Sequence, residues 1–329
     1  MSVIYNGTNL ETEFGMVCLG RGTYGAPARD IEQIHVPGRS GDLLIDNGGF
    51  LNFDLTYPNC TIQEDFPYQA RRLRNFLLSN PGYHKLTDSY NPGVYRMAEF
   101  RGPFAAEAHT ARGNMSSVFD LVFNCKPLRY LDTSNARIYL AGVASDSTSI
   151  PYFCESDTCN ISITNNSSSS KTFRAVDLID GITHTASAAA GDTASINISN
   201  AAGKVFKVES PVPSDNLDVS IRINNLLMYS YSSGTTRFRD TFLAADCKTA
   251  VRHWKGSISH AGGSFTSGYY TYSENSIDSE TYVISDSSWG AQASGQPPVL
   301  EPGLNTLTIT SDQIGSTGYV YLEPRFCIL

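Results

Sequence analysis

Side chains capable of chemistry are spread along this sequence and form few close groups. Cys154 and Cys159 are the only cysteines near each other, and their spacing in an extended segment allows a local disulfide or half of a metal site. No second pair with zinc-type spacing accompanies them, and two reduced thiols are the simpler interpretation. The six histidines show no i,i+4 pairing, and G-x-S-x-G, H-E-x-x-H and G-K-[ST] motifs do not occur. We therefore predict no catalytic residue, no metal and no cofactor, with a glycosidase built from two distant carboxylates as the enzymatic alternative.

A glycine pattern near the N-terminus also has a possible chemical meaning. Residues 20–25 read Gly-Arg-Gly-Thr-Tyr-Gly and match G-x-G-x-x-G, whose glycines let backbone amides approach a phosphate at the start of a helix. That use requires a strand–helix unit, and the sequence from Pro27 onward shows no helical period. We interpret residues 20–25 as a glycine-rich loop.

Aromatic residues are abundant in the C-terminal half, and a flat aromatic face on a β-sandwich is able to stack on a sugar ring. Packing within the core or across strands is the competing interpretation for any one of them. The core-packing interpretation has the least support for one tryptophan and for a group of tyrosines surrounded by Gly and Ser. The predicted saccharide contacts are Trp254, Tyr269, Tyr270 and Tyr272.

The elements that would position these side chains are mainly strands, with one strong helix signal. Apolar residues recur at helical spacing over 66–79, Pro67 suits the first turn, and Asp65 is placed to cap the helix. Pro81 and Gly82 end it. Before the helix, Phe53, Leu55 and Tyr57 alternate with polar residues, which predicts a half-buried strand. Further strands are predicted near 94–100, 116–124, 160–164, 172–179, 194–198, 204–209, 218–223, 281–285, 305–310 and 318–322.

Many short strands with little helix predict a mainly β chain of two domains. We place the boundary near residue 132, which gives a strand-rich domain with one helix over 1–132 and a sandwich or jelly-roll-like domain over 133–329. The chain has 329 residues and a net charge of −8, and its pI of about 5.2 argues against a nucleic-acid clamp. It shows no secretory signal and no run of about 18 apolar residues, so we expect synthesis in the cytoplasm and no membrane insertion.

An ordered set of segments resembles the siphophage distal tail proteins, also called Dit or baseplate hub proteins. The first segment is Ile34-His35-Val36-Pro37-Gly38-Arg39-Ser40-Gly41-Asp42-Leu43-Leu44, followed by the strand over 50–57. The other segments, in the same order as in the family, are 66–79, 82–89, 95–98, 123–127, 300–307 and 323–326. The sequence departs from the family where Phe326 and Cys327 replace a frequent pair of tryptophans, and its second domain is longer than in compact members.

This resemblance implies a structural protein of the virion at the distal end of a phage tail, made in the host cytoplasm. Its N-terminal, β-sandwich-like domain would form a homohexameric ring, and its C-terminal domain would be a galectin- or carbohydrate-module-like β-sandwich outside the ring. The implied partners are the tail tube protein, a tail-tip protein and a receptor-binding protein. Six copies at −8 carry −48, so the ring would repel DNA passing through its lumen. Residues 37–44 are polar and Gly-rich and lie between predicted strands, so we expect an extended loop or hairpin that reaches a neighbour or the lumen. The residues that we predict at the ring interface or lumen are Pro37, Gly38, Arg39, Gly41 and Asp42.

A carbohydrate-binding module that attaches to host cell-wall saccharides is the alternative function. Under it, the aromatic residues named above would make the contacts, and the N-terminal domain would serve as a mount.

Overall fold

The computed structural model divides the chain into two compact units, Met1–Tyr130 with Leu329, and Leu131–Ile328. They are called the first and second unit below, and each is described by itself. The structure describes residues 2–18, 25–63, 65–106, 109–111, 114–116, 118–132, 138–142, 148–210, 218–232, 234–240, 243–251, 256–260, 263–266, 270–271, 283–284, 300–311 and 319–329.

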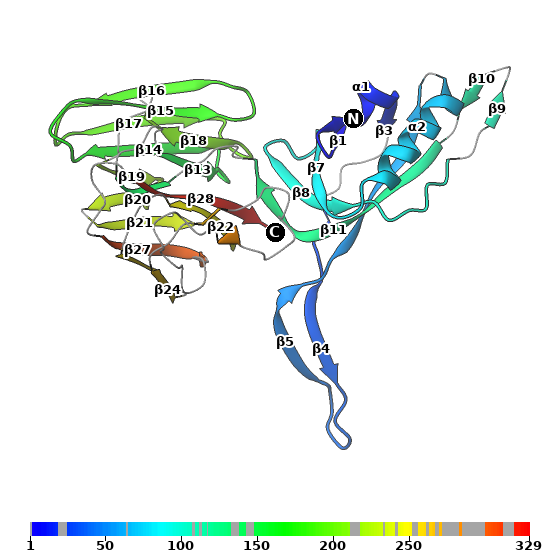
Figure 1. Ribbon diagram of the computed structural model, residues 1–329, viewed down its shortest axis with the longest axis horizontal. Helices are drawn as coiled ribbons and strands as arrows, with labels where there is room; N and C mark the ends of the chain where they lie inside the picture. Colours follow the sequence, from blue (N-terminus) through cyan, green and yellow to red (C-terminus); the bar gives the residue numbers. More distant parts are fainter. Residues whose placement is uncertain are drawn as a thin grey trace. The chain divides into compact units, whose positions relative to one another are not determined.

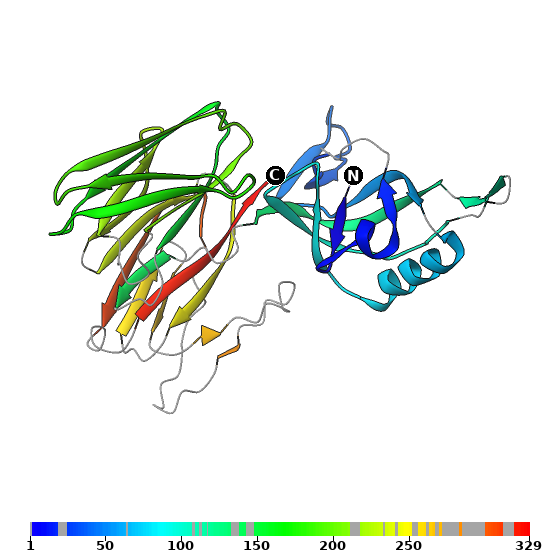
Figure 2. The ribbon, with the colours of Figure 1, turned by 90° about the horizontal axis from the view of Figure 1, so that it is seen from above.

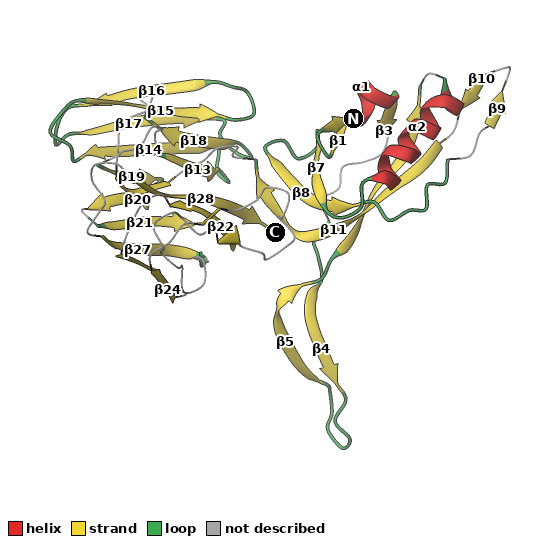
Figure 3. Cartoon of the chain, viewed as in Figure 1, coloured by secondary structure: helices red, strands yellow, loops and turns green. Residues whose placement is uncertain are grey.

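Strands build both units, and the predicted mainly β fold is confirmed (Figure 3). The prediction of a single helix is corrected, because the described part of the first unit contains two helices: α1 (Leu10–Phe14) and α2 (Phe66–Ser79). Helix α1 has only five residues, which is too short for a helical period to stand out in the sequence. Asn9 caps it, its Oδ1 accepting from the backbone N–H of Glu11 at 3.0 Å, and Gly15 ends it with a φ of 65°.

The main sheet of the first unit orders its strands β2–β1–β7–β8–β11–β6–β3. Pairing is antiparallel at β1–β2, β1–β7, β7–β8, β6–β11 and β3–β6. The predicted strand at 53–57 belongs to β6, in which Leu55 and Tyr57 are buried and Asp54 and Thr56 exposed. The bounds are β1 (Val3–Tyr5), β2 (Thr8–Asn9), β3 (Met16–Cys18), β6 (Phe53–Ile62), β7 (His84–Asp88), β8 (Val94–Glu99) and β11 (Val118–Leu131). Strands β9 (His109–Ala111) and β10 (Asn114–Ser116) pair in a separate two-stranded sheet.

Helix α2 packs its apolar face against this sheet (Figure 1). Leu73 and Leu77 are fully buried with Phe119, Leu121 and Phe123 of β11 in one hydrophobic cluster. The bounds predicted for the helix, 66–79, are confirmed.

The predicted side-chain cap at the start of α2 is wrong. Asp65 has a left-handed φ of 40°, and its carboxylate caps no backbone N–H. A capping side chain normally projects from an extended backbone, which Asp65 does not have. Its carbonyl oxygen instead accepts from the N–H groups of Tyr68 and Gln69 at 3.1 and 3.0 Å.

The second unit contains two larger sheets, and Figure 2 shows their strands lying in layers. The first has the order β13–β18–β15–β16, and the second has the order β17–β14–β19–β20–β21–β27–β23–β24. The bounds of the first are β13 (Ser149–Phe153), β15 (Lys171–Asp177), β16 (Thr183–Ala188) and β18 (Val205–Glu209). Those of the second are β14 (Thr158–Asn165), β17 (Thr193–Ser199), β19 (Val219–Ile223), β20 (Leu226–Ser232), β21 (Thr235–Asp240), β23 (Gly256–His260), β24 (Gly263–Thr266) and β27 (Gly303–Ser311).

The core of this unit is apolar and aromatic, and Phe173, Phe206 and Ile221 are fully buried in it. Strands β12 (Ile138–Gly142) and β22 (Leu243–Val251) flank β28 (Tyr319–Ile328). Strand β25 (Tyr270–Thr271) pairs with β26 (Val283–Ile284), the described part of the strand predicted at 281–285.

A charged cluster on the first of these sheets is buried at its centre. The Glu209 side chain is 5% exposed and binds Lys207 Nζ at 2.7 Å and Arg174 Nε at 2.7 Å. Burial alone would raise the pKa of Glu209, but the hydrogen bonds and positive charges of Lys207 and Arg174 outweigh it, and the pKa is lowered.

Candidate functional site

The candidate site is a β-hairpin that projects from the rest of the first unit (Figure 1). Strand β4 (Arg29–Ile34) pairs with β5 (Leu43–Phe50) in a two-stranded sheet of their own. Every residue from 31 to 48 is exposed. The sequence predicted an extended loop or hairpin around Pro37–Leu44, and a hairpin is what the structure contains.

The tip of the hairpin brings together the five residues predicted for a ring interface or lumen. Arg39 N–H donates to the carbonyl of Val36 at 3.2 Å, which closes a four-residue turn with Pro37 and Gly38 at its centre. Pro37 fixes the first central position, and Gly38 has a φ of 85° at the second, as a type II turn requires. Pro37, Gly38, Arg39, Gly41 and Asp42 are all exposed there. Their contact with a neighbouring chain stays a prediction.

The register of the ladder sorts the hairpin side chains onto two faces. Ile34 pairs with Leu43 and Glu32 pairs with Ile45, and directly opposed residues of an antiparallel pair project to the same side. One face therefore carries Ile34, Leu43 and Ile45, which are 36%, 39% and 40% exposed, together with Glu32. We call the three aliphatic residues the apolar face. The opposite face carries Ile31, Gln33, Leu44 and Asp46.

Polar contacts hold the base of the hairpin. Arg29 Nη1 forms an ion pair with Asp46 Oδ2 at 2.9 Å, and its guanidinium lies 5.5 Å from the centre of the Phe50 ring. The N–H of Gly48 donates to Asp46 Oδ1 at 2.9 Å, and this bond is the main cause of the lowered pKa of Asp46, with Arg29 adding to it. Near the tip, His35 Nδ1 lies 3.2 Å from Asp42 Oδ1. Residues 29–50 hold four acidic and two basic residues, so the hairpin is acidic.

This arrangement suits association between proteins. An isolated two-stranded hairpin gains little stability from water-exposed pairing, and its outer strand edges have unpaired backbone groups. Three aliphatic side chains on one exposed face add apolar area that a partner is able to cover. Across the described ranges, no group of three or more His, Cys, Asp or Glu side chains is arranged to hold a metal ion.

The predicted saccharide contacts fall almost entirely outside the described residues. Trp254, Tyr269 and Tyr272 lie outside the described residues, and of Tyr270 only the backbone is described, paired with Ile284 in β25–β26. They stay a prediction, and so does the loop at 20–25, of which only Gly25 is described.

Cys154 and Cys159 are two buried thiols that no disulfide joins. Cys154 Sγ donates to the Ser156 carbonyl at 3.1 Å. Burial, followed by the neighbouring Cys154, raises the pKa of Cys159 to about 12. A thiol with so high a pKa is a poor nucleophile and a poor metal ligand at neutral pH.

Sequence reasoning missed the apolar face of the hairpin. The signal for it was the alternation of Leu43 and Ile45 along one strand, a pattern that predicts a strand but does not say what covers it. Among the helices of the described structure, none is both long and apolar enough to cross a membrane.

Comparison with solved structures gives a distant similarity. The structure is similar to Dit (gp 19.1) of phage SPP1, described as a paradigm of the hub adsorption apparatus in phages that infect Gram-positive bacteria. The match has a TM-score of 0.33 and 12% sequence identity, and it covers 64% of this chain and 98% of that one. No protein-family model and no curated protein sequence matches the chain.

Proposed function

We propose that this chain is a structural protein of a siphophage tail, a distal tail hub that assembles through the β4–β5 hairpin into a ring of six copies. The ring joins the tail tube to the host-adhesion device and leaves a lumen through which DNA passes. The chain catalyses no reaction in this role.

The observation that carries the proposal is the exposed hairpin. Its tip is the segment in which the sequence resembles the distal tail proteins, and its apolar face lacks a cover within the hairpin's own two-stranded sheet. A neighbouring copy that packs on this face buries three aliphatic side chains at once, and each contributes about 1 kcal/mol for roughly half of its area. Closed rings repeat one such contact around an axis, so no copy is left with an open interface.

The test is the mass of the purified chain in solution, combined with negative-stain imaging. The proposal expects six-fold rings with a central hole and the mass of six 35.8-kDa chains. A double variant, Ile34→Asp with Leu43→Asp, places two charges on the apolar face and is expected to yield monomers.

The matched control is Ile182→Asp, because Ile182 is 51% exposed in the second unit and lies outside the hairpin. This variant should still assemble. Rings from the double variant would show that the hairpin is not the assembly element. Glycan binding by a wild-type chain that stays monomeric would favour the carbohydrate-binding alternative.

A further inference from the structure

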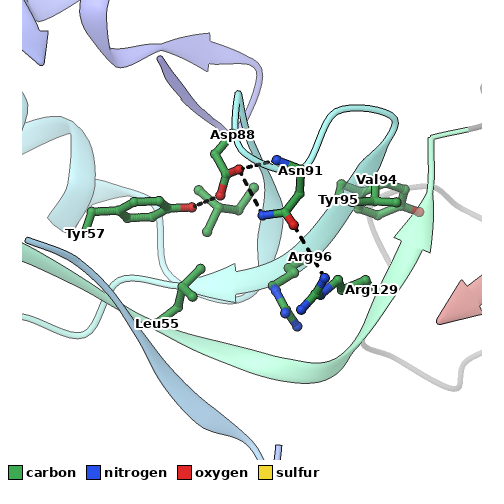
Figure 4. Close-up of a pocket in the computed structure, with 9 residues that line it drawn as sticks. Leu55, Tyr57, Asp88, Asn91, Val94, Tyr95, Arg96 and Arg129 are labelled. Carbon is green, nitrogen blue, oxygen red and sulfur yellow. Dashed lines mark hydrogen bonds between the residues drawn. The ribbon is translucent and has the colours of Figure 1, made fainter. Parts of the chain in front are cut away.

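A small cavity in the first unit is lined by charged side chains that the hub role does not use. It lies between β6, β7, β8 and β11, and the centre of a water-sized sphere has about 10 Å³ open to it there. Figure 4 shows Arg96 and Arg129 side by side on it, with Asn91 above them and Asp88 between Tyr57 and Asn91.

Arg96 is a buried cation whose hydrogen bonds are incomplete. Arg96 is only 6% exposed, and its Nη2 has no hydrogen-bond partner. Nη1 reaches only the Pro127 carbonyl at 3.5 Å, and the guanidinium lies 4.9 Å from the centre of the Phe53 ring. No carboxylate among the described residues forms an ion pair with it. A buried charge without a counter-charge is costly, so the site favours an incoming group of opposite sign.

The nearby carboxylate is already engaged. Asp88 Oδ2 accepts from the Tyr57 hydroxyl at 2.8 Å, and Oδ1 accepts from the backbone N–H of Tyr90 and Asn91 at 3.0 and 2.9 Å. These bonds shape the turn after β7 and leave Asp88 outside hydrogen-bond contact with Arg96.

A second cation lies close by. Asn91 Oδ1 accepts from Arg129 Nη1 at 3.4 Å, which holds that guanidinium beside the cavity. Burial, and then the charge of Arg129, lowers the pKa of Arg96 to about 10, which still leaves Arg96 protonated at neutral pH. The site therefore combines two guanidinium charges and one carboxylate charge, a net of +1, with an N–H donor of Arg96 that lacks a partner.

We propose that this cavity binds a small inorganic anion of the size of chloride, held by Arg96 Nη2 and by the positive field of Arg129. A water molecule is able to accept from Arg96 Nη2, but it carries no charge to offset the buried guanidinium. The proposal is independent of ring assembly.

The test is amide hydrogen exchange of the full chain while chloride replaces gluconate at constant ionic strength. Both tryptophans lie in residues 133–329, so exchange of the β8 and β11 amides is the readout specific to the first unit. An anion that binds only the folded state slows their exchange by 1 + [Cl⁻]/Kd, which is about 11-fold at ten times Kd. We expect this slowing in the wild type, its loss in Arg96→Gln, and its retention in Arg74→Gln, whose arginine is exposed on α2.

A second measurement applies even where Arg96→Gln does not fold. Crystals of the wild-type chain grown in bromide should show an anomalous peak within hydrogen-bond distance of Arg96 Nη2. Equal exchange rates in chloride and gluconate, or the same chloride effect in Arg96→Gln as in the wild type, would overturn the proposal. A bromide data set with no peak in the cavity would overturn it as well.

Discussion

Ile34 and Leu43 face each other at the last pair of the hairpin ladder, and both are more than one-third exposed. A pair of aliphatic side chains directly opposed on one face of an antiparallel ladder normally lies against a core. Here the pair stands on a ribbon whose residues 31–48 are all exposed, next to a turn fixed by Pro37 and Gly38. This relationship links the sequence motif at the tip with the surface proposed to assemble.

Charge reversal at the tip should weaken assembly without unfolding the chain. The Arg39 side chain makes no hydrogen bond or ion pair with any described residue, so its charge is available to a neighbour. Arg39→Glu adds negative charge to an acidic hairpin and should shift the mass toward monomers. Stability should change by less than about 0.5 kcal/mol, as at most exposed positions. Sedimentation measures the first effect and urea unfolding the second, with Arg237→Glu, an exposed arginine of β21, as the control.

A methyl group at Gly38 should loosen the tip through the backbone alone. Gly38 has a φ of 85°, and a Cβ placed there meets no atom within 4 Å. Gly38→Ala therefore carries only the conformational cost of a left-handed residue, about 1 kcal/mol. Faster amide exchange of Arg39 is the expected result. Gly49→Ala, which has equal space and no positive φ, should leave that exchange unchanged, and a slower exchange in Gly38→Ala would contradict the turn assignment.

Truncation of the buried face of α2 should destabilise the first unit. Leu73 is fully buried in the hydrophobic cluster of the first unit, so Leu73→Ala removes packed methyl groups and leaves a cavity at a cost of about 2–5 kcal/mol. Leu78 lies on the same helix but is 55% exposed, and Leu78→Ala should cost less than about 1 kcal/mol. Urea unfolding followed by helical circular dichroism compares the two. Similar losses from both variants would show that α2 is packed differently.

Acid should destabilise the second unit through Glu209. The folded pKa of this group is lowered, so its contribution is complete above the ordinary Glu pKa of about 4.3 and is lost as the pH falls through the folded pKa. Glu209→Gln should be less stable than the wild type at neutral pH by about 1–3 kcal/mol, and the difference should shrink in acid. Tryptophan fluorescence reports on this unit. Glu155→Gln, at an exposed position, should follow the wild-type curve, and a difference for Glu209→Gln that persists below the folded pKa would contradict the assigned ion pairs.

The sequence by itself determined the elements with a clear period. The alternation of Phe53, Leu55 and Tyr57 with polar residues predicted part of β6. The helical spacing of apolar residues from Pro67 to the stop at Pro81 predicted α2 with its observed bounds. The sequence also indicated an extended loop or hairpin over residues 37–44, because this segment is polar and rich in Gly. Such features depend on neighbours along the chain.

Only the tertiary structure decided features that depend on distant residues. Helix α1 forms because Leu10 and Phe14 are buried in the core, although five residues show no period of their own. The backbone at Asp65 turns left-handed before α2, and a side chain that fits a cap in sequence is carried out of position. Among the described strands β4 pairs only with β5, which leaves the apolar face exposed. The Arg96 cavity forms because β8 and β11 lie together while Asp88 bonds to Tyr57 and to the turn after β7. Local preferences set a chain's period and turns, whereas burial and missing counter-charges arise only after segments far apart in sequence have packed.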